Sequence, residues 1–362
     1  MEVSGPGRQL VASIERLAEL GLSVRVLVFR RKGRSVSPFE NFLASHSIDY
    51  RVVEEGYTFG PGALKRFRTQ LNSYAPDLVQ THGYKPSACM FFARSFAFCK
   101  TAWIAFFHGA TAENLKVRAY HWLDQQLMKK ADLVTVMSMH HKNDAVSLGN
   151  KIRIVYNAVL LPADPQRGLR TVQRNTKSPV TIGVVGRLSP EKGVDVFLEA
   201  CSRLDADGYK YRALIAGDGP ERESLERMAS NLGLGAAVEF VGHLRNTDDL
   251  YRQLDVLVIP SRSEGLPNVL LEALRFGLPI AATTVGAIPE VLSDPRAGRL
   301  CRVDDAAALE RVIREVSSRE YALDGLGARD ELLDRYSLER RTAALIALYK
   351  EAMDLRSHQA GH

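Results

Sequence analysis

Cysteine is scarce in this sequence, and long apolar runs are missing from it. The 362 residues contain four cysteines, Cys89, Cys99, Cys201 and Cys301, and these form no metal-binding or redox spacing. Scattered cysteines favour a reducing compartment over a disulfide framework. No apolar run approaches the roughly 18 residues that a membrane-spanning helix requires. Residues 1–7 are polar and glycine-rich, unlike a secretory signal. We therefore expect a soluble, cytoplasmic protein.

Acidic residues are under-represented in the first part of the chain. Up to Leu160, 21 Lys and Arg face 12 Asp and Glu, whereas the remainder holds 27 against 30, for a net charge of +6. Clusters at Arg30–Arg34 and Lys65–Arg68 supply much of the excess. They form either a solvated surface or an attraction to an anionic partner, namely a membrane surface or a phosphorylated acceptor. No nucleic-acid-binding motif accompanies the charge, so nucleic acid is not an expected partner.

Short apolar runs alternate with helical patterns along the whole chain, which predicts a parallel α/β architecture. Strands are expected at 24–29, 78–81, 102–107, 133–136, 152–155, 180–185, 212–216, 238–241, 256–259 and 280–283. Helices are expected at 9–20, 63–74, 116–130 and 138–148, and others should begin near 194, 221, 248 and 267.

The domain boundary is expected in residues 161–178, which are polar, contain two prolines and have no apolar period. Residues 1–160 then form a first Rossmann-like domain and residues 179–336 a second, while a final helix at about 337–354 packs back on the first. Two doubly wound sheets facing each other place a cleft between the carboxyl ends of their strands, where such folds bind ligands.

The first domain lacks one expected element. A doubly wound domain opens with a strand that lies in the middle of its sheet. This chain opens instead in a glycine loop, Ser4-Gly5-Pro6-Gly7, followed directly by a helix. We expect the first strand of the N-terminal domain to be missing, through a misassigned start codon or a truncation.

The strongest motif covers residues 261–273. An apolar strand ends, a short loop carries Glu264, and a helix starts at about Pro267, since proline suits the first helical turn. The helix dipole and nearby backbone amides predict an anion site. Glu272 lies near enough to accept hydrogen bonds from a ribose diol. As isolated residues, both glutamates would be read as solvated charges. The amides of this anion site belong to Gly265, Leu266, Asn268 and Val269.

Two further loops follow predicted strands of the second half. Arg187 and Lys192 bracket a turn after the strand at 180–185, where a guanidinium fork and an ammonium group could hold a pyrophosphate. Surface salt bridges are the alternative. Gly217 belongs to half of a dinucleotide glycine fingerprint. His243 and Leu244 end another strand at the same edge, where backbone groups could read a nucleobase.

Two possible metal motifs do not fit this arrangement. Asp205-Ala206-Asp207 has the form of a metal-binding Asp-x-Asp, but its polar turn lies away from the predicted ligand edge. His140-His141 has no third ligand nearby, and adjacent residues on a helix do not share a face. We predict no metal and no cofactor.

Together these segments resemble the group-1 glycosyltransferases, family 4 in the sequence classification, which have the GT-B fold. The most specific part is Glu264 and Glu272 with seven residues between them, read together with Arg187 and Lys192. The segments 284–290 and 156–159 also match, although Ala158 stands where the family usually has glycine.

The resemblance implies roles for individual residues. Arg187 and Lys192 would hold the donor diphosphate, Glu272 the ribose, and Glu264 the hydroxyls of the transferred sugar. The family's active-site histidine matches His108. Approach to the diphosphate from the other domain would fall to Gly5 and Gly7.

The implied activity is retaining, metal-independent transfer of a hexose from a nucleotide diphosphate sugar. The acceptor would be a glycan, a lipid-linked compound or a small molecule, in cell-surface polysaccharide or glycolipid synthesis. Attachment to the inner face of the cytoplasmic membrane is compatible with this. Uridine and guanosine donors both fit. The alternatives are a non-catalytic nucleotide-sugar-binding protein and a nucleotide-sugar epimerase of the same fold.

Overall fold

The computed structural model describes residues 5–56, 60–96, 101–107, 115–160, 179–244 and 246–360. The chain divides into two compact units. Unit 1 comprises Met1–Ala158 and Leu338–His362, and unit 2 comprises Val159–Ser337. Among the described residues, no helix is both long and apolar enough to cross a membrane.

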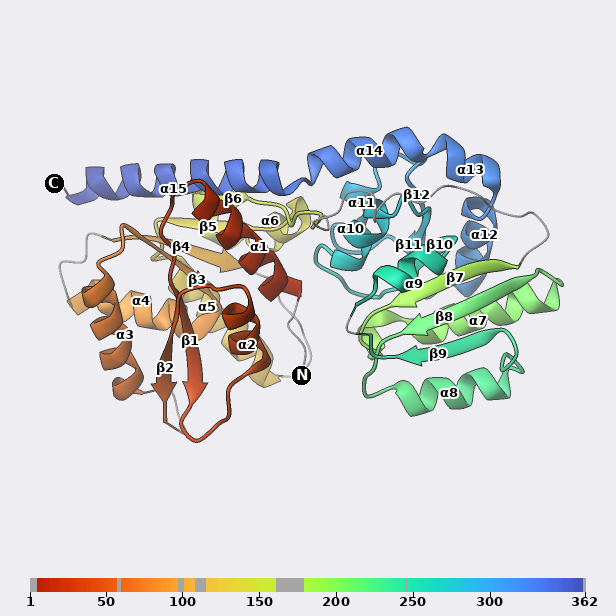
Figure 1. Ribbon diagram of the computed structural model, residues 1–362, viewed down its shortest axis with the longest axis horizontal. Coiled ribbons are helices and arrows are strands. Elements are labelled where there is room, and N and C mark those ends of the chain that lie inside the picture. Colours follow the sequence, from red (N-terminus) through yellow and green to blue (C-terminus); the bar gives the residue numbers. More distant parts are fainter. Residues whose placement is uncertain are drawn as a thin grey trace. The chain divides into compact units, whose positions relative to one another are not determined.

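Unit 1 is built from parallel strands and helices (Figure 1). Its elements are α1 (Gly5–Glu19), β1 (Val26–Arg31), α2 (Pro38–Ser45), β2 (Tyr50–Glu55), α3 (Pro61–Tyr74), β3 (Leu78–His82), α4 (Tyr84–Phe96), β4 (Ala102–Phe107), α5 (Leu115–Met128), β5 (Leu133–Val136), α6 (Met139–Asp144), the 3-10 helix η1 (Val146–Lys151), β6 (Ile152–Ile154) and α15 (Leu338–Ala360). In the described residues, β1 and β2 form one sheet and β3-β4-β5-β6 another.

The four-stranded sheet is covered on both faces. Ile104 and Phe106 of β4 pack with Leu345 of α15, although α15 is more than 200 residues away in the sequence. The alternate residues, such as Trp103, point to the opposite face and pack with residues of α3, α4 and α5. All six residues of β4 are buried, as is usual for a central strand of a parallel sheet.

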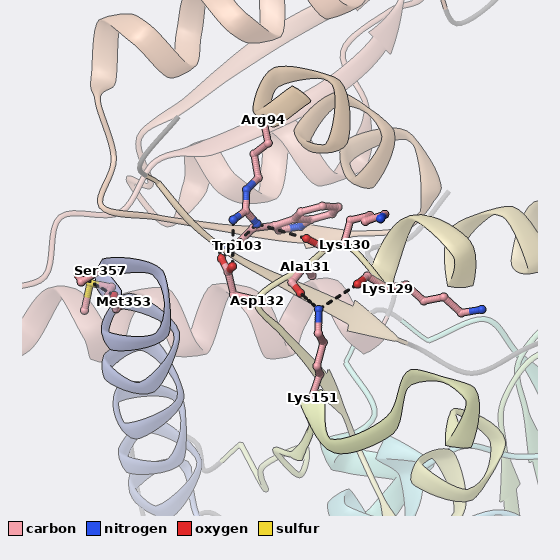
Figure 2. A network of polar contacts seen from close by, with 9 residues as sticks. All are labelled: Arg94, Trp103, Lys129, Lys130, Ala131, Asp132, Lys151, Met353 and Ser357. Carbon is pink, nitrogen blue, oxygen red and sulfur yellow. Dashed lines mark hydrogen bonds and ion pairs between the residues drawn. The ribbon is translucent and has the colours of Figure 1, made fainter. Parts of the chain in front are cut away.

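A polar network closes the amino ends of β4 and β5 (Figure 2). Arg94 donates to both carboxylate oxygens of Asp132, at 3.2 and 2.9 Å, and the Trp103 amide donates to Asp132 at 2.7 Å. Lys151 donates to the carbonyls of Lys129 and Ala131 at 3.0 and 2.9 Å. These charges satisfy backbone and side-chain groups at the sheet's amino edge, so their role is structural.

The described residues of unit 2 form one sheet of six strands (Figure 1). Its elements are β7 (Val180–Val185), the 3-10 helix η3 (Pro190–Lys192), α7 (Val194–Ala206), β8 (Tyr211–Ala216), α8 (Arg222–Asn231), β9 (Val238–Gly242), α9 (Asp248–Gln253), β10 (Val256–Ile259), α10 (Asn268–Arg275), β11 (Ile280–Thr283), α11 (Ile288–Val291), β12 (Gly298–Cys301), α12 (Ala306–Val316), α13 (Arg319–Asp324) and α14 (Leu326–Arg335).

The strand order of unit 2 creates a ligand-binding edge. The order is β12-β11-β10-β7-β8-β9, and every pairing is parallel. After β7 the chain adds β8 and then β9 on one side of β7. It then returns to place β10 on the other side of β7, followed by β11 and β12. Loops after the neighbouring strands β7 and β10 therefore diverge at a topological switch point, the place where doubly wound sheets bind ligands.

The predicted α/β fold is confirmed, and the bounds of β4, β5, β7, β10 and β11 agree with the expected ones. The expected glycine loop is wrong from Gly5 onward, because α1 begins there. Pro6 costs no hydrogen bond in a first helical turn, and the helix is held by its buried Val11 and Ile14. No described strand precedes α1.

Candidate functional site

The loops at the carboxyl ends of the unit 2 strands bring the predicted residues to one sheet edge. Arg187 follows β7, Gly217 follows β8, His243 follows β9, and Glu264 follows β10. Because all six strands are parallel, these loops emerge on the same side. The site is therefore assembled from four separate strand ends.

Lys192 and Glu264 meet across the switch point. The Lys192 ammonium lies 2.7 Å from Glu264 Oε1, and the Ser261 hydroxyl donates to the same oxygen at 2.7 Å. The Glu264 side chain is 8% exposed and that of Lys192 is 25% exposed. Burying a carboxylate is costly unless it is paired and hydrogen-bonded, and these two partners meet that need. The two residues assigned to diphosphate and sugar are thus direct neighbours.

Glycines let the backbones of these loops touch. A Cβ on Gly286 would lie 2.2 Å from the carbonyl oxygen of Glu264, and one on Gly217 would lie 1.7 Å from that of Gly186. The amide of Ala287 also donates to the Gly265 carbonyl at 2.8 Å. The loop after β11 therefore supports the glutamate-bearing loop directly. The sequence pattern around Gly286 resembles the family but does not by itself indicate this supporting contact.

Helix α10 presents its first turn at this edge. Pro267 is its N-cap, with φ −70° and ψ 126°, and contributes no side-chain cap. This agrees with a helix start at about Pro267. Asn268 and Val269 occupy the first turn, where the helix dipole favours an anion. The Leu266 side chain is buried, so this residue can offer a ligand only its backbone.

Glu272, one turn further along α10, has a partner that sequence analysis missed. The hydroxyl of Tyr251 on α9 donates to Glu272 Oε2 at 2.8 Å. Tyr251 is fully buried and stacks on Phe276, with ring centroids 5.3 Å apart. Burial and the neighbouring Glu272 carboxylate raise the pKa of Tyr251, so the hydroxyl stays a donor.

A second missed residue, Arg262, ties three loops together. Its guanidinium donates to both oxygens of Asp195 at 2.9 and 2.5 Å, and to Asp304 at 2.6 Å. It also donates to the Pro190 carbonyl at 2.8 Å. Hydrogen bonding to Asp195 raises the pKa of Arg262 above its ordinary value. Burial favours a protonated Asp195, yet its contacts with Arg262 prevail and lower its pKa.

The remaining predicted residues are placed as follows. Arg187 and His243 are exposed on their loops, and Gly217 and Leu244 are half-buried. Gly5 and Gly7 form part of the first turn of α1, in unit 1. His108 lies outside the described residues.

The two weak metal motifs belong to different units, and each has a local structural setting. Asp207 caps the end of α7, at the amino edge of the sheet, and pairs with Arg314 at 2.8 Å. His141 is buried, and its Nδ1 lies 3.0 Å from the Ser138 hydroxyl. Within the described ranges, no group of three or more His, Cys, Asp or Glu side chains could hold a metal ion.

The sequence matches two families over most of its length. Residues 3–161 match the family described as Glycosyltransferase Family 4. Residues 167–330 match the family described as Glycosyl transferases group 1. Two parallel α/β units with a loop-lined switch point define a fold of the GT-B class. The chain belongs to the group 1, family 4 glycosyltransferases.

Individual relatives share 28–31% of their residues with this chain over the aligned parts. An uncharacterized 41.2 kDa protein in the cps region of Klebsiella pneumoniae is 31% identical over 201 residues, which cover 53% of this chain and 53% of that protein. The putative colanic acid biosynthesis glycosyltransferase WcaL of Salmonella typhimurium is 28% identical over 59% of this chain and 55% of its own. The alignments therefore span little more than half the length of these relatives.

Solved structures share the fold. Anabaena HepE in complex with UDP superposes with a TM-score of 0.79 at 17% identity, covering 96% of both chains. Sucrose-phosphate synthase from Thermosynechococcus elongatus superposes with a TM-score of 0.76 at 18% identity, covering 96% of this chain and 93% of its own.

Proposed function

We propose that this protein is a retaining, metal-independent glycosyltransferase that uses a nucleotide diphosphate sugar. The observation that carries the proposal is the pairing of Lys192 with Glu264 at 2.7 Å, at the switch point and beside the start of α10. A cation, a carboxylate and a helix N-terminus together suit a ligand with both a diphosphate and sugar hydroxyls. HepE, a protein of the same fold, was solved with UDP and with glucose.

Each contact has an assigned partner on the donor. Arg187 and Lys192 bind the diphosphate, Glu272 accepts from the ribose, and Glu264 accepts from hydroxyls of the transferred sugar. Base-side contacts come from the loops carrying Gly217, His243 and Leu244, and diphosphate contacts come from the amides of Gly265, Leu266, Asn268 and Val269. His108, Gly5 and Gly7 are proposed as further contacts to the donor.

The proposed reaction breaks the bond between the anomeric carbon and the phosphate oxygen. The carbon passes through an oxocarbenium-like state, and the acceptor oxygen bonds to it on the face that the phosphate leaves. The acceptor's proton goes to the departing phosphate. Arg187, Lys192 and the helix dipole stabilise the charge that grows on the diphosphate.

The test is to incubate the protein with UDP- and GDP-sugars and to follow both release of the nucleotide and the fate of the sugar. Transfer or hydrolysis with retained anomeric configuration supports the proposal. Binding without turnover would identify a nucleotide-sugar-binding protein, and inversion at C2 of the sugar would identify an epimerase. Lys192→Ala and Glu264→Gln should each reduce turnover at least tenfold, the loss expected for one charged contact.

The acceptor is proposed to be a glycan or lipid-linked compound of cell-surface polysaccharide synthesis, in keeping with the cps and colanic acid relatives. A small-molecule acceptor remains the alternative outcome of an acceptor screen. Nucleic acid is not proposed as a partner.

Unit 1 is proposed to attach reversibly to the inner face of the cytoplasmic membrane. Arg30 is partly neutralised by buried Glu40 at 2.9 Å. Arg31 likewise lies 4.0 Å from the carboxylate of buried Glu55. The other exposed cations of the two basic segments are Lys32, Arg34, Lys65, Arg66 and Arg68. Each is worth about 1 kcal/mol near such a surface.

Vesicle sedimentation tests this attachment. The protein should sediment with phosphatidylglycerol vesicles at low salt and dissociate from them at high salt. It should not sediment with phosphatidylcholine vesicles. Replacing Lys65, Arg66 and Arg68 by Gln should weaken it. Failure to sediment at low salt would mean that the basic segments are only a solvated surface.

A further inference from the structure

The fully buried tyrosine beside Glu272 has an orientation that serves the carboxylate. Tyr251 lies on α9 and is 0% exposed, yet its hydroxyl reaches across to Glu272 Oε2 on α10 at 2.8 Å. The Glu272 side chain is only half-buried. One oxygen of this carboxylate is thus tied to the core, while the residue as a whole remains accessible to a ligand.

Further contacts fix the position of the Tyr251 ring. Its ring stacks on Phe276 at an interplanar angle of 18°. The guanidinium of Arg275 lies 4.5 Å from the Phe276 ring centroid, donates to Asp248 at the start of α9, and donates to the Leu160 carbonyl at 3.0 Å. Helices α9 and α10 are therefore joined by two polar links and one aromatic stack, and the hydroxyl of Tyr251 has little freedom to turn away.

Such a link fixes the plane of the carboxylate. A glutamate side chain loses up to about 2 kcal/mol of rotamer freedom when it is immobilised. If a core hydroxyl already holds one oxygen, a ligand that accepts the same rotamer avoids most of that cost. A carboxylate of fixed plane can also receive two hydroxyls side by side, which a freely turning one does less well.

We propose that Tyr251 is a positioning residue that makes the site prefer ribonucleotides over deoxyribonucleotides, by holding the Glu272 carboxylate toward the ribose diol. The inference rests on the proposed function, in which Glu272 accepts hydrogen bonds from the ribose. It adds a determinant of sugar specificity that lies wholly outside the ligand's reach.

The experiment compares affinities for UDP and GDP with those for their 2′-deoxy and 3′-deoxy counterparts, by calorimetry. Tyr251→Phe removes one oxygen and keeps the stacking on Phe276. We expect it to weaken ribonucleotide binding about fivefold to tenfold, the size of effect expected for loss of one intramolecular hydrogen bond. Deoxynucleotide binding should change less than twofold, so the ratio of the two affinities should fall.

A matched control is available in the same unit. Tyr211 is also buried and donates a single hydrogen bond, to the Cys201 carbonyl at 2.9 Å, but it lies at the opposite edge of the sheet. Tyr211→Phe should lower thermal stability by a similar amount and leave the affinity ratio unchanged. Equal changes in both variants would overturn the proposal, because the effect of Tyr251 would then be general loss of stability.

Glu272→Ala separates this inference from the proposed function. If Glu272→Ala abolishes the ribonucleotide preference and Tyr251→Phe leaves it intact, the positioning role is wrong and the ribose assignment stands. If Glu272→Ala leaves both affinity and preference intact, the ribose assignment itself is wrong. Should Tyr251→Phe fail to fold, the wild-type protein still decides. In NMR spectra of the wild type, the chemical shift of the Tyr251 hydroxyl proton should change on adding the ribonucleotide and not on adding the deoxynucleotide. Equal changes would overturn the proposal.

Discussion

Arg262 and Asp195 form a bidentate ion pair between the loop after β10 and the first turn of α7, with N–O distances of 2.9 and 2.5 Å. The pair flanks the contact between Lys192 and Glu264, because Arg262 lies two residues before Glu264 and Asp195 three residues after Lys192. The backbone amide of Arg262 also donates to the Glu191 carbonyl at 2.8 Å. The ion pair therefore sets the spacing of the two loops that carry the proposed donor contacts.

Replacing Arg262 should disturb the site more than the fold. We expect Arg262→Ala to reduce both nucleotide affinity and turnover about tenfold, since several charge-assisted hydrogen bonds between the loops are lost. Arg262→Lys should recover part of this. The exposed Arg302 is a suitable control, and Arg302→Ala should change neither value by more than twofold. Nucleotide titrations and initial rates provide the measurement, and equal behaviour of the two alanine variants would contradict the prediction.

Gly193 lies close to the backbone that follows β10. Its φ is +62°, and a Cβ there would lie 2.2 Å from the Pro260 carbonyl oxygen. Gly208 has a similar φ of +70°, but nothing lies within 4 Å of its Cβ position. Gly208→Ala should cost about 1 kcal/mol of unfolding free energy from the left-handed backbone alone.

Gly193→Ala should therefore cost more than Gly208→Ala, by about 1–3 kcal/mol for the added steric clash. It should also weaken nucleotide binding, because Lys192 is displaced with the loop. Thermal unfolding and nucleotide titration of the two variants test this together. Similar losses in both would show that the contact with Pro260 relaxes without cost.

Asp124 predicts a pH-dependent stability for unit 1. Its side chain is 9% exposed, and burial raises its pKa to about 6, against a weaker opposing effect of a hydrogen bond with Ser87. An unfolded aspartate has a pKa of about 3.9. The folded state thus binds the proton more tightly. Ionisation of Asp124 therefore lowers the free energy of unfolding. This destabilisation is absent below about pH 4, grows as the pH rises to about 6, and reaches its full value above pH 6.

Asp124→Asn removes this destabilisation. The free energy of unfolding of the variant, relative to that of the wild type, should increase by on the order of 2 kcal/mol between pH 4 and pH 7. Urea unfolding at several pH values measures the difference, with exposed Asp77→Asn as the control for loss of a carboxylate. A difference between Asp124→Asn and wild type that stays constant with pH would contradict the assignment.

Chelation tests the proposed independence from metals. If Arg187 and Lys192 neutralise the diphosphate, transfer and donor binding should survive excess EDTA, because the positive charge is supplied by the chain. Complete loss of activity that Mn²⁺ restores would contradict this. It would direct attention back to Asp205 and Asp207.

Much of the fold follows from local patterns in the sequence. Strands such as β4 and β10 are short, continuous apolar runs, and residues buried on both faces must have that composition. Two of the strands that were missed lack such a run. Strand β12 contains Gly298 and Arg299, and β2 ends in a buried glutamate, Glu55.

The site shows the same division. Glu264, Glu272, Arg187 and Lys192 could be proposed from the sequence, because each stands close to a predicted strand end or helix start. Their partners could not. That Lys192 contacts Glu264 depends on β7 pairing with β10 rather than with β9, and that Tyr251 holds Glu272 depends on how α9 packs on α10. Local periodicity determines which residues form strands and helices, whereas contacts between distant residues depend on strand order and helix packing, which only the tertiary structure decides.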